Sequence, residues 1–202
     1  MGGGVNFDSF VSAASYQNNV YIFGDYEENM NLGGVDYTSH FAADLSSFVM
    51  QLNSTGDMQW IKLYNNYYEM FAYKMYFTNN GIFLLGSVHG NPQFTNTTLY
   101  FNRIAMFIQL SYSGVPILET DLVRADSNTS YSTAMSILSV VNQTDVFYIH
   151  GEFLNGQHWR VNGSVIYFDG FGLRDLYVLK AIPDYHTAKM NVLWIVPMGG
   201  NN

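Results

Sequence analysis

Three short stretches of the sequence decide its fold: Val20-Tyr-Ile-Phe-Gly24, Ile82-Phe-Leu-Leu-Gly86 and Phe147-Tyr-Ile-His-Gly151. Each is a short run that contains β-branched and aromatic residues and ends in glycine, which is typical of a β-strand. A polar turn and an alanine-containing strand precede each run, so each run is expected to be the second strand of a hairpin. The glycines, at positions 24, 86 and 151, lie 62 and 65 residues apart. This spacing predicts a repeat protein.

A second hairpin is predicted after each glycine, beyond a long loop. The segment from Phe48 to Trp60 matches that from Met106 to Leu118, with a Gln-Leu pair and a Ser/Thr-Gly turn at the same spacing. A looser third copy runs from Leu176 to Trp194, and the matched positions of Trp60 and Trp194 predict core packing for both. Each unit therefore contains two hairpins, or four strands. The units are 1–66 (beginning with the end of a preceding unit), 67–128 and 129–202.

The pattern of Val20 to Gly24 followed by Phe48 to Trp60, with partial copies ending at Leu118 and Trp194, resembles the bacterial-type seven-bladed β-propeller repeat. The resemblance implies a secreted or cell-surface protein and no catalytic residue. The size and strand count of each unit fit one blade of a β-propeller, or one layer in another stack of β-repeats. We therefore expect an all-β protein, a propeller-like array of three four-stranded antiparallel blades.

Three blades are fewer than the roughly four to eight that close a propeller ring. An open array leaves a sheet edge or an apolar face in water at each end, and such surfaces favour association. Met-Gly-Gly begins at both Met1 and Met198, and the repeat continues in phase across the two ends. We expect neighbouring copies to complete the array, as a ring or as a fibre. One alternative is that the chain is a segment of a longer tandem polypeptide, and another is that Met-Gly-Gly recurs by chance in a glycine-rich sequence.

The composition excludes several classes of protein. The 202 residues include 16 acidic and 8 basic ones, and the net charge of −8 disfavours nucleic acid or an anionic membrane as a partner. A hydrophobic content of 48% is too high for a disordered chain. No apolar run approaches the roughly 20 residues of a membrane span, and residues 1–6 lack the features of a signal peptide. The absence of cysteine excludes disulfides and metal–thiolate sites.

Five Asn-x-Ser/Thr sequons predict N-glycosylation, because all of them fall in expected turns or loops, where an acceptor must be exposed. They favour an extracellular glycoprotein, whereas the alternative is an asparagine-rich protein that never meets the glycosylation machinery. The five acceptors are Asn53, Asn96, Asn128, Asn142 and Asn162.

No nucleophile elbow, phosphate-binding loop or histidine pair with metal-ligand spacing occurs, so we predict no enzymatic activity, no metal and no cofactor. Acidic clusters such as 25–28 lack the order of a calcium loop and are predicted to be solvated loop charges. Candidate ligand-binding residues are Trp159, in a polar segment expected to be a loop, and Tyr185 and His186, near the expanded third turn.

The function that these features favour is structural. We expect an extracellular glycoprotein module that self-associates end to end into a fibre, coat or appendage, with copies of itself as its partner. The alternative is a glycan- or protein-binding adhesin or lectin-like propeller, in which the loop residues stack on a sugar.

Overall fold

The computed structural model describes residues 8–39, 45–64, 69–89, 103–125, 132–141, 145–154, 157–162, 164–168 and 174–199. Within these ranges the chain forms sixteen β-strands and no helix. Every strand pairing there is antiparallel. The prediction of an all-β, antiparallel protein is therefore confirmed.

The first sheet has four strands in the order β1-β2-β5-β6. A separate two-stranded hairpin, β3–β4, is inserted between β2 and β5. The strands are β1 (Asp8–Tyr16), β2 (Asn19–Glu27), β3 (Asn29–Leu32), β4 (Val35–Thr38), β5 (Leu45–Leu52) and β6 (Met58–Tyr64).

The third sheet also has four strands, in the order β11-β12-β15-β16, but the middle sheet has six, in the order β14-β13-β10-β9-β8-β7. The hairpin β13–β14 lies between β12 and β15 in the sequence, yet it pairs with β10 of the middle sheet. The prediction of four strands is therefore wrong for the middle sheet. The strands are β7 (Glu69–Thr78), β8 (Gly81–His89), β9 (Arg103–Leu110), β10 (Pro116–Ala125), β11 (Ser132–Val141), β12 (Val146–Leu154), β13 (Gln157–Val161), β14 (Ser164–Phe168), β15 (Arg174–Asp184) and β16 (Lys189–Met198).

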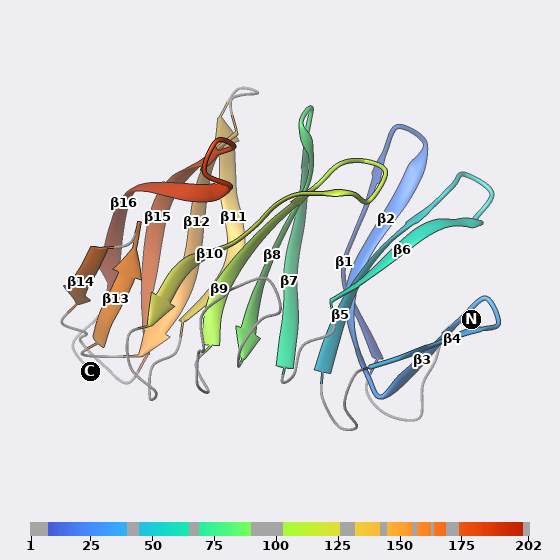
Figure 1. The fold of residues 1–202 in the computed structure, drawn as a ribbon, viewed down its shortest axis with the longest axis horizontal. Helices are drawn as coiled ribbons and strands as arrows, with labels where there is room; N and C mark the ends of the chain where they lie inside the picture. Colours follow the sequence, from blue (N-terminus) through green and yellow to red (C-terminus); the bar gives the residue numbers. More distant parts are fainter. Residues whose placement is uncertain are drawn as a thin grey trace.

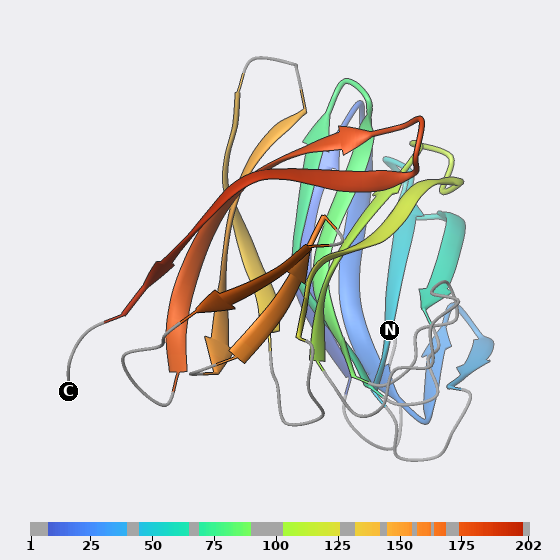
Figure 2. The same ribbon diagram turned by 60° about the vertical axis from the view of Figure 1, so that its left-hand side comes forward.

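The three main sheets stand side by side in sequence order, with the middle sheet between the other two (Figure 1). One apolar cluster fills the space between the first and middle sheets, with residues such as Phe23, Val49 and Ile108. A second cluster lies between the middle and third sheets, where the rings of Phe83 and Phe147 are 4.7 Å apart. Figure 2 shows the β15–β16 hairpin bending across toward β10. Strands β7–β9 of the middle sheet are thus buried on both faces.

The three glycines of the repeated motif occupy equivalent places in the three sheets. In each hairpin the pairing register shifts next to the glycine, which is a β-bulge. A Cβ on Gly24 would lie 2.1 Å from Ser9 O, and one on Gly86 would lie 2.5 Å from Phe71 O. Glycine is needed at these two positions because the neighbouring strand approaches so closely. The glycine pairs on its other side are Gly24↔Phe48, Gly86↔Met106 and Gly151↔Tyr177.

A second bulge recurs in the hairpins β5–β6, β9–β10 and β15–β16. It precedes the pairs Gln51↔Trp60, Gln109↔Leu118 and Lys180↔Trp194. Trp60 and Leu118 each pack into the cluster shared with the following sheet. Trp194 has the equivalent place in the third sheet, so its side chain lies on the face that no described sheet covers.

Candidate self-association surfaces

One face of the third sheet points away from the middle sheet, and we call it the trailing face. It carries four large apolar side chains: Leu176 is 44% exposed, Trp194 41%, Val196 49% and Met198 44%. The cross-strand pairs Val178↔Val196 and Leu176↔Met198 make these side chains contiguous. Single exposed apolar residues are common on protein surfaces, whereas a contiguous group of them is a candidate interaction surface.

Trp194 packs beside the Tyr148 ring on the trailing face. Its ring centroid is 5.9 Å from that of Tyr148, and the Lys180 Nζ lies 5.6 Å from the Tyr148 centroid, within cation–π range. The expectation that Trp194 packs in the core like Trp60 is wrong. The position in the repeat determines which face the side chain occupies, and here no described sheet lies over that face.

The opposite end of the array is the face of the first sheet that points away from the middle sheet, which we call the leading face. The β3–β4 hairpin covers part of it, and Met30 on the hairpin is buried against Tyr26 and Phe48. In Figure 1 this hairpin crosses one end of the first sheet, whereas the β5–β6 turn lies at the other end. Among the residues left exposed on this face are Phe10 (64%), Val20 (37%) and Met58 (37%).

A carboxylate that the sequence did not predict to be buried lies between the first and middle sheets. Asp25 lies in β2, is 4% exposed, and accepts hydrogen bonds from Ser47 Oγ (2.6 Å) and Ala72 N (2.8 Å) at Oδ1. Burial raises the pKa of Asp25 to about 6, although both hydrogen bonds lower it. The interpretation of this acidic cluster as solvated loop charge is therefore wrong for Asp25, which links β2 to β7.

Two of the predicted glycosylation acceptors lie in the described structure. In the β5–β6 turn, Asn53 Oδ1 accepts hydrogen bonds from Thr55 N and Asp57 N, and Asn53 Nδ2 donates to Asp57 Oδ2 (3.1 Å). The other three acceptors, Asn96, Asn128 and Asn142, lie outside the described residues.

Asn162, in the β13–β14 turn, fastens this hairpin to β16. Its Oδ1 accepts a hydrogen bond from Val192 N (2.9 Å), while Nδ2 donates to Val192 O (2.6 Å) and to Asn191 Oδ1 (3.1 Å). An N-linked glycan replaces one Nδ2 hydrogen, so modification of the folded protein would cost one of these two donations.

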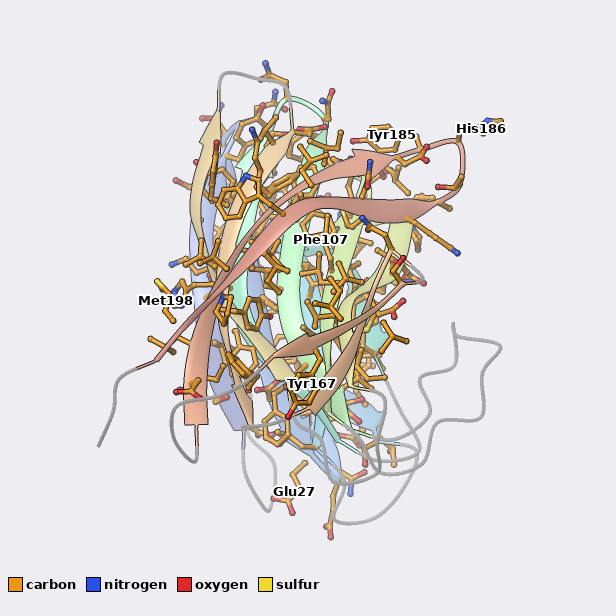
Figure 3. All side chains as sticks on the ribbon, turned by 90° about the vertical axis from the view of Figure 1, so that its left-hand side faces the viewer. Glu27, Phe107, Tyr167, Tyr185, His186 and Met198 are labelled. Carbon is orange, nitrogen blue, oxygen red and sulfur yellow. The ribbon has the colours of Figure 1, made fainter. Side chains whose placement is uncertain are left out.

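The three candidate ligand-binding residues lie in two different parts of the fold. Trp159 lies in β13, paired with Ala125 and Ile166, and not in a loop as expected; its side chain is outside the described part. Tyr185 and His186 lie in the β15–β16 turn, at the tip of the hairpin (Figure 3). The Tyr185 hydroxyl donates to Asp145 Oδ2 (2.7 Å). Burial, and then this hydrogen bond, raise the pKa of Tyr185 to about 12.

Among the described residues, no group of three histidine or acidic side chains could hold a metal ion. No helix there is long and apolar enough to cross a membrane. Comparison with known proteins found no family model and no curated protein that matches the chain.

Proposed function

We propose that this chain is a structural module, a propeller-like array of antiparallel sheets that associates end to end with copies of itself. The observation that carries the proposal is the contrast among the three main sheets. Strands β7–β9 of the middle sheet have apolar side chains buried on both faces. The trailing face of the third sheet, and the part of the leading face that the β3–β4 hairpin does not cover, leave apolar side chains exposed. Burial of apolar surface is the main favourable term in most protein association, and it has no requirement for charge.

The shared positions of the two bulges support treating the three sheets as repeats of one unit. If they are equivalent, the trailing face of one copy can meet the leading face of the next as neighbouring sheets meet within the chain. Such a contact joins two different surfaces, so it generates a ring when its rotation closes and a fibre when it does not.

Sedimentation velocity over a range of concentrations, together with electron microscopy of the native material, tests the proposal. We expect species that grow with concentration and have regular shape, and that persist in 0.5 M NaCl, because salt screens charges but does not weaken apolar contacts. A chain that stays monomeric at every concentration, or an assembly that dissolves in 0.5 M NaCl, would contradict it.

We further propose that the assembly is an extracellular fibre, coat or appendage that carries N-linked glycans. The five sequons support this part of the proposal. A loss of mass on treatment of the native protein with peptide-N-glycosidase is the expected result, and an unchanged mass would contradict it. The glycan- or protein-binding alternative stays a prediction, for a glycan array to test with the Trp159→Ala variant as control.

A further inference from the structure

The contact between the first two sheets contains a tryptophan seated on a turn. The Trp60 Nε1–H donates a hydrogen bond to Tyr112 O (3.2 Å) in the β9–β10 turn. A Cβ on Gly114 of the same turn would lie 2.8 Å from Trp60 Cδ2. The Trp60 ring therefore rests on the turn backbone, and the position of Gly114 leaves no room for a larger residue.

The trailing face presents the same tryptophan without a turn to cover it. The Tyr148 and Trp194 ring centroids are 5.9 Å apart with an interplanar angle of 58°, and those of Tyr21 and Trp60 are 6.2 Å apart at 57°. Both tryptophans follow a bulge and pair with the equivalent residue of the neighbouring strand. Trp194 is thus oriented like Trp60 but is 41% exposed.

The first sheet presents the same turn without a tryptophan on it. In residues 53–57, Asn53 N donates to Asp57 O (3.0 Å) and Gly56 N donates to Asn53 O (3.0 Å). Residues 111–115 form the equivalent two bonds, at 2.8 and 3.0 Å. The φ angles of Gly56 and Gly114 are 87° and 80°. No atom outside the immediate chain lies within 4 Å of the position a Gly56 Cβ would take.

We propose that Trp194 of one copy docks on the Gly56 turn of the next copy. The Trp194 ring lies on Gly56, and its Nε1–H donates to the carbonyl oxygen of Ser54, which holds the place of Tyr112. The proposal rests on the end-to-end association proposed above and specifies the residues that make it. A tryptophan that fills a pocket at the centre of an interface is a frequent hot spot of binding.

The residues beside the tryptophan fit a second copy. Within the chain, Lys62 faces Glu119 across the first junction, with Nζ 3.6 Å from Oε1. At the open ends the equivalent positions hold Val196, paired with Val178, and Ile61, paired with Met50. Where the internal junction has Lys62 and Glu119, the open ends have Val196 and Ile61. Both charged residues are replaced by apolar ones, so the trailing and leading faces match each other in chemistry.

The rest of the leading face leaves this turn accessible. The β3–β4 hairpin covers the end of the first sheet away from the β5–β6 turn (Figure 1). Asn53 lies in the same turn as Gly56, so a glycan on Asn53 and a docked Trp194 would compete. We expect Asn53 to be unmodified in assembled copies.

Two single variants of the full chain test the proposal, because each removes one half of the contact. Trp194→Ala removes the ring, and Gly56→Asn adds a side chain where the ring would lie while tolerating the positive φ angle. We expect each variant alone to raise the apparent dissociation constant of assembly at least about 30-fold. Val115→Ser, which removes an exposed apolar side chain (59%) from the middle sheet's turn, is the matched control and should assemble normally.

Mixing the two variants gives the decisive result. An equimolar mixture should form dimers and nothing longer, because Trp194 of the Gly56→Asn chain can still dock on Gly56 of the Trp194→Ala chain. A mixture that stays monomeric, or single variants that assemble like the unsubstituted chain, would overturn the proposed contact. If the single variants assemble like the unsubstituted chain, only the Trp194–Gly56 contact is overturned, and end-to-end association still stands. If the unsubstituted chain never assembles, both the contact and end-to-end association are overturned.

Discussion

The junction between the first and middle sheets and the trailing face of the third sheet contain the same tyrosine–tryptophan pair in the same geometry. At the junction, Trp60 is covered by the β9–β10 turn, with Tyr112 and Gly114 against it. On the trailing face, Trp194 lies beside Tyr148 of its own sheet, and no other sheet in the described part of the chain lies over it. The position of a residue within the repeated unit therefore determines which face of the sheet its side chain occupies. The burial of that side chain depends on whether another sheet packs against that face.

The largest expected effect comes from removing each tryptophan in turn. We expect Trp60→Ala to lower the free energy of unfolding by about 3 kcal/mol, because it empties a packed site and removes a hydrogen bond. Trp194→Ala should cost about 1 kcal/mol or less when measured by urea denaturation at concentrations where the chain is monomeric. Equal costs for the two variants would mean that Trp194 is buried within a single chain.

The pH dependence of stability tests the polar part of the junction. The pKa of Asp25 is raised to about 6 in the folded state, above its usual value near 4. At this group the folded state therefore binds more protons than the unfolded state, so the contribution of Asp25 to stability is fully present below about pH 4 and is lost as the pH rises through about 6. We expect a loss of about 2 to 3 kcal/mol across this interval, measured by denaturation at several pH values.

Asp25→Asn should remove this loss, because the amide stays neutral throughout. Asp57 provides the control. Hydrogen bonds from Thr55 and Asn53 lower its pKa, so its contribution has the opposite sign and is lost as the pH falls. Asp57→Asn should therefore leave the fall between pH 4 and 6 intact, and a fall that also persists in Asp25→Asn would rule out Asp25 as its source.

Much of the fold could be predicted because its decisive residues act locally. Gly24 and Gly86 are required because the adjacent strand approaches them closely, so a glycine at this position of the repeat marks the second strand of a sheet. The hairpins β3–β4 and β13–β14 were missed because strands of four or five residues are too short to show an alternating pattern. The pairing of β13 with β10 joins segments far apart in the sequence, which no local pattern reports.

The candidate site was less predictable for a related reason. The burial of Asp25 depends on Ser47 and on the backbone of Ala72, which belongs to the next sheet. The repeat does place Trp60 and Trp194 at one position of the unit, and that signal was sufficient to find the face. That signal was not sufficient to show that Trp60 is covered and Trp194 is exposed. Whether each side chain is covered depends on whether another sheet follows its own sheet in the array, and the sequence of a single unit does not report this.

The two turn glycines give a smaller effect with an internal control. Gly56→Ala and Gly114→Ala both place a side chain at a positive φ angle, at a shared cost of about 1 kcal/mol. Only Gly114→Ala also meets Trp60, so we expect it to cost a further 1 to 2 kcal/mol, roughly the penalty of overpacking. In the Trp60→Ala background the difference between the two glycine variants should vanish, and its persistence would show that another neighbour causes it.

The smallest expected effect concerns the Lys62–Glu119 ion pair, whose side chains are 28% and 21% exposed. A partly exposed pair contributes about 0.5 kcal/mol, so Lys62→Met should reduce the free energy of unfolding by that amount at low salt and by almost nothing in 1 M NaCl.

Val196 holds the equivalent place on the trailing face, where Val196→Lys should leave the monomer's stability unchanged but weaken assembly. Adding Ile61→Glu to Val196→Lys should restore assembly in a form that salt now dissolves, because the pair reproduces the charges of the internal junction. Assembly that is indifferent to Val196→Lys, or that the second substitution does not restore, would show that the trailing and leading faces do not meet in the register of the internal sheets.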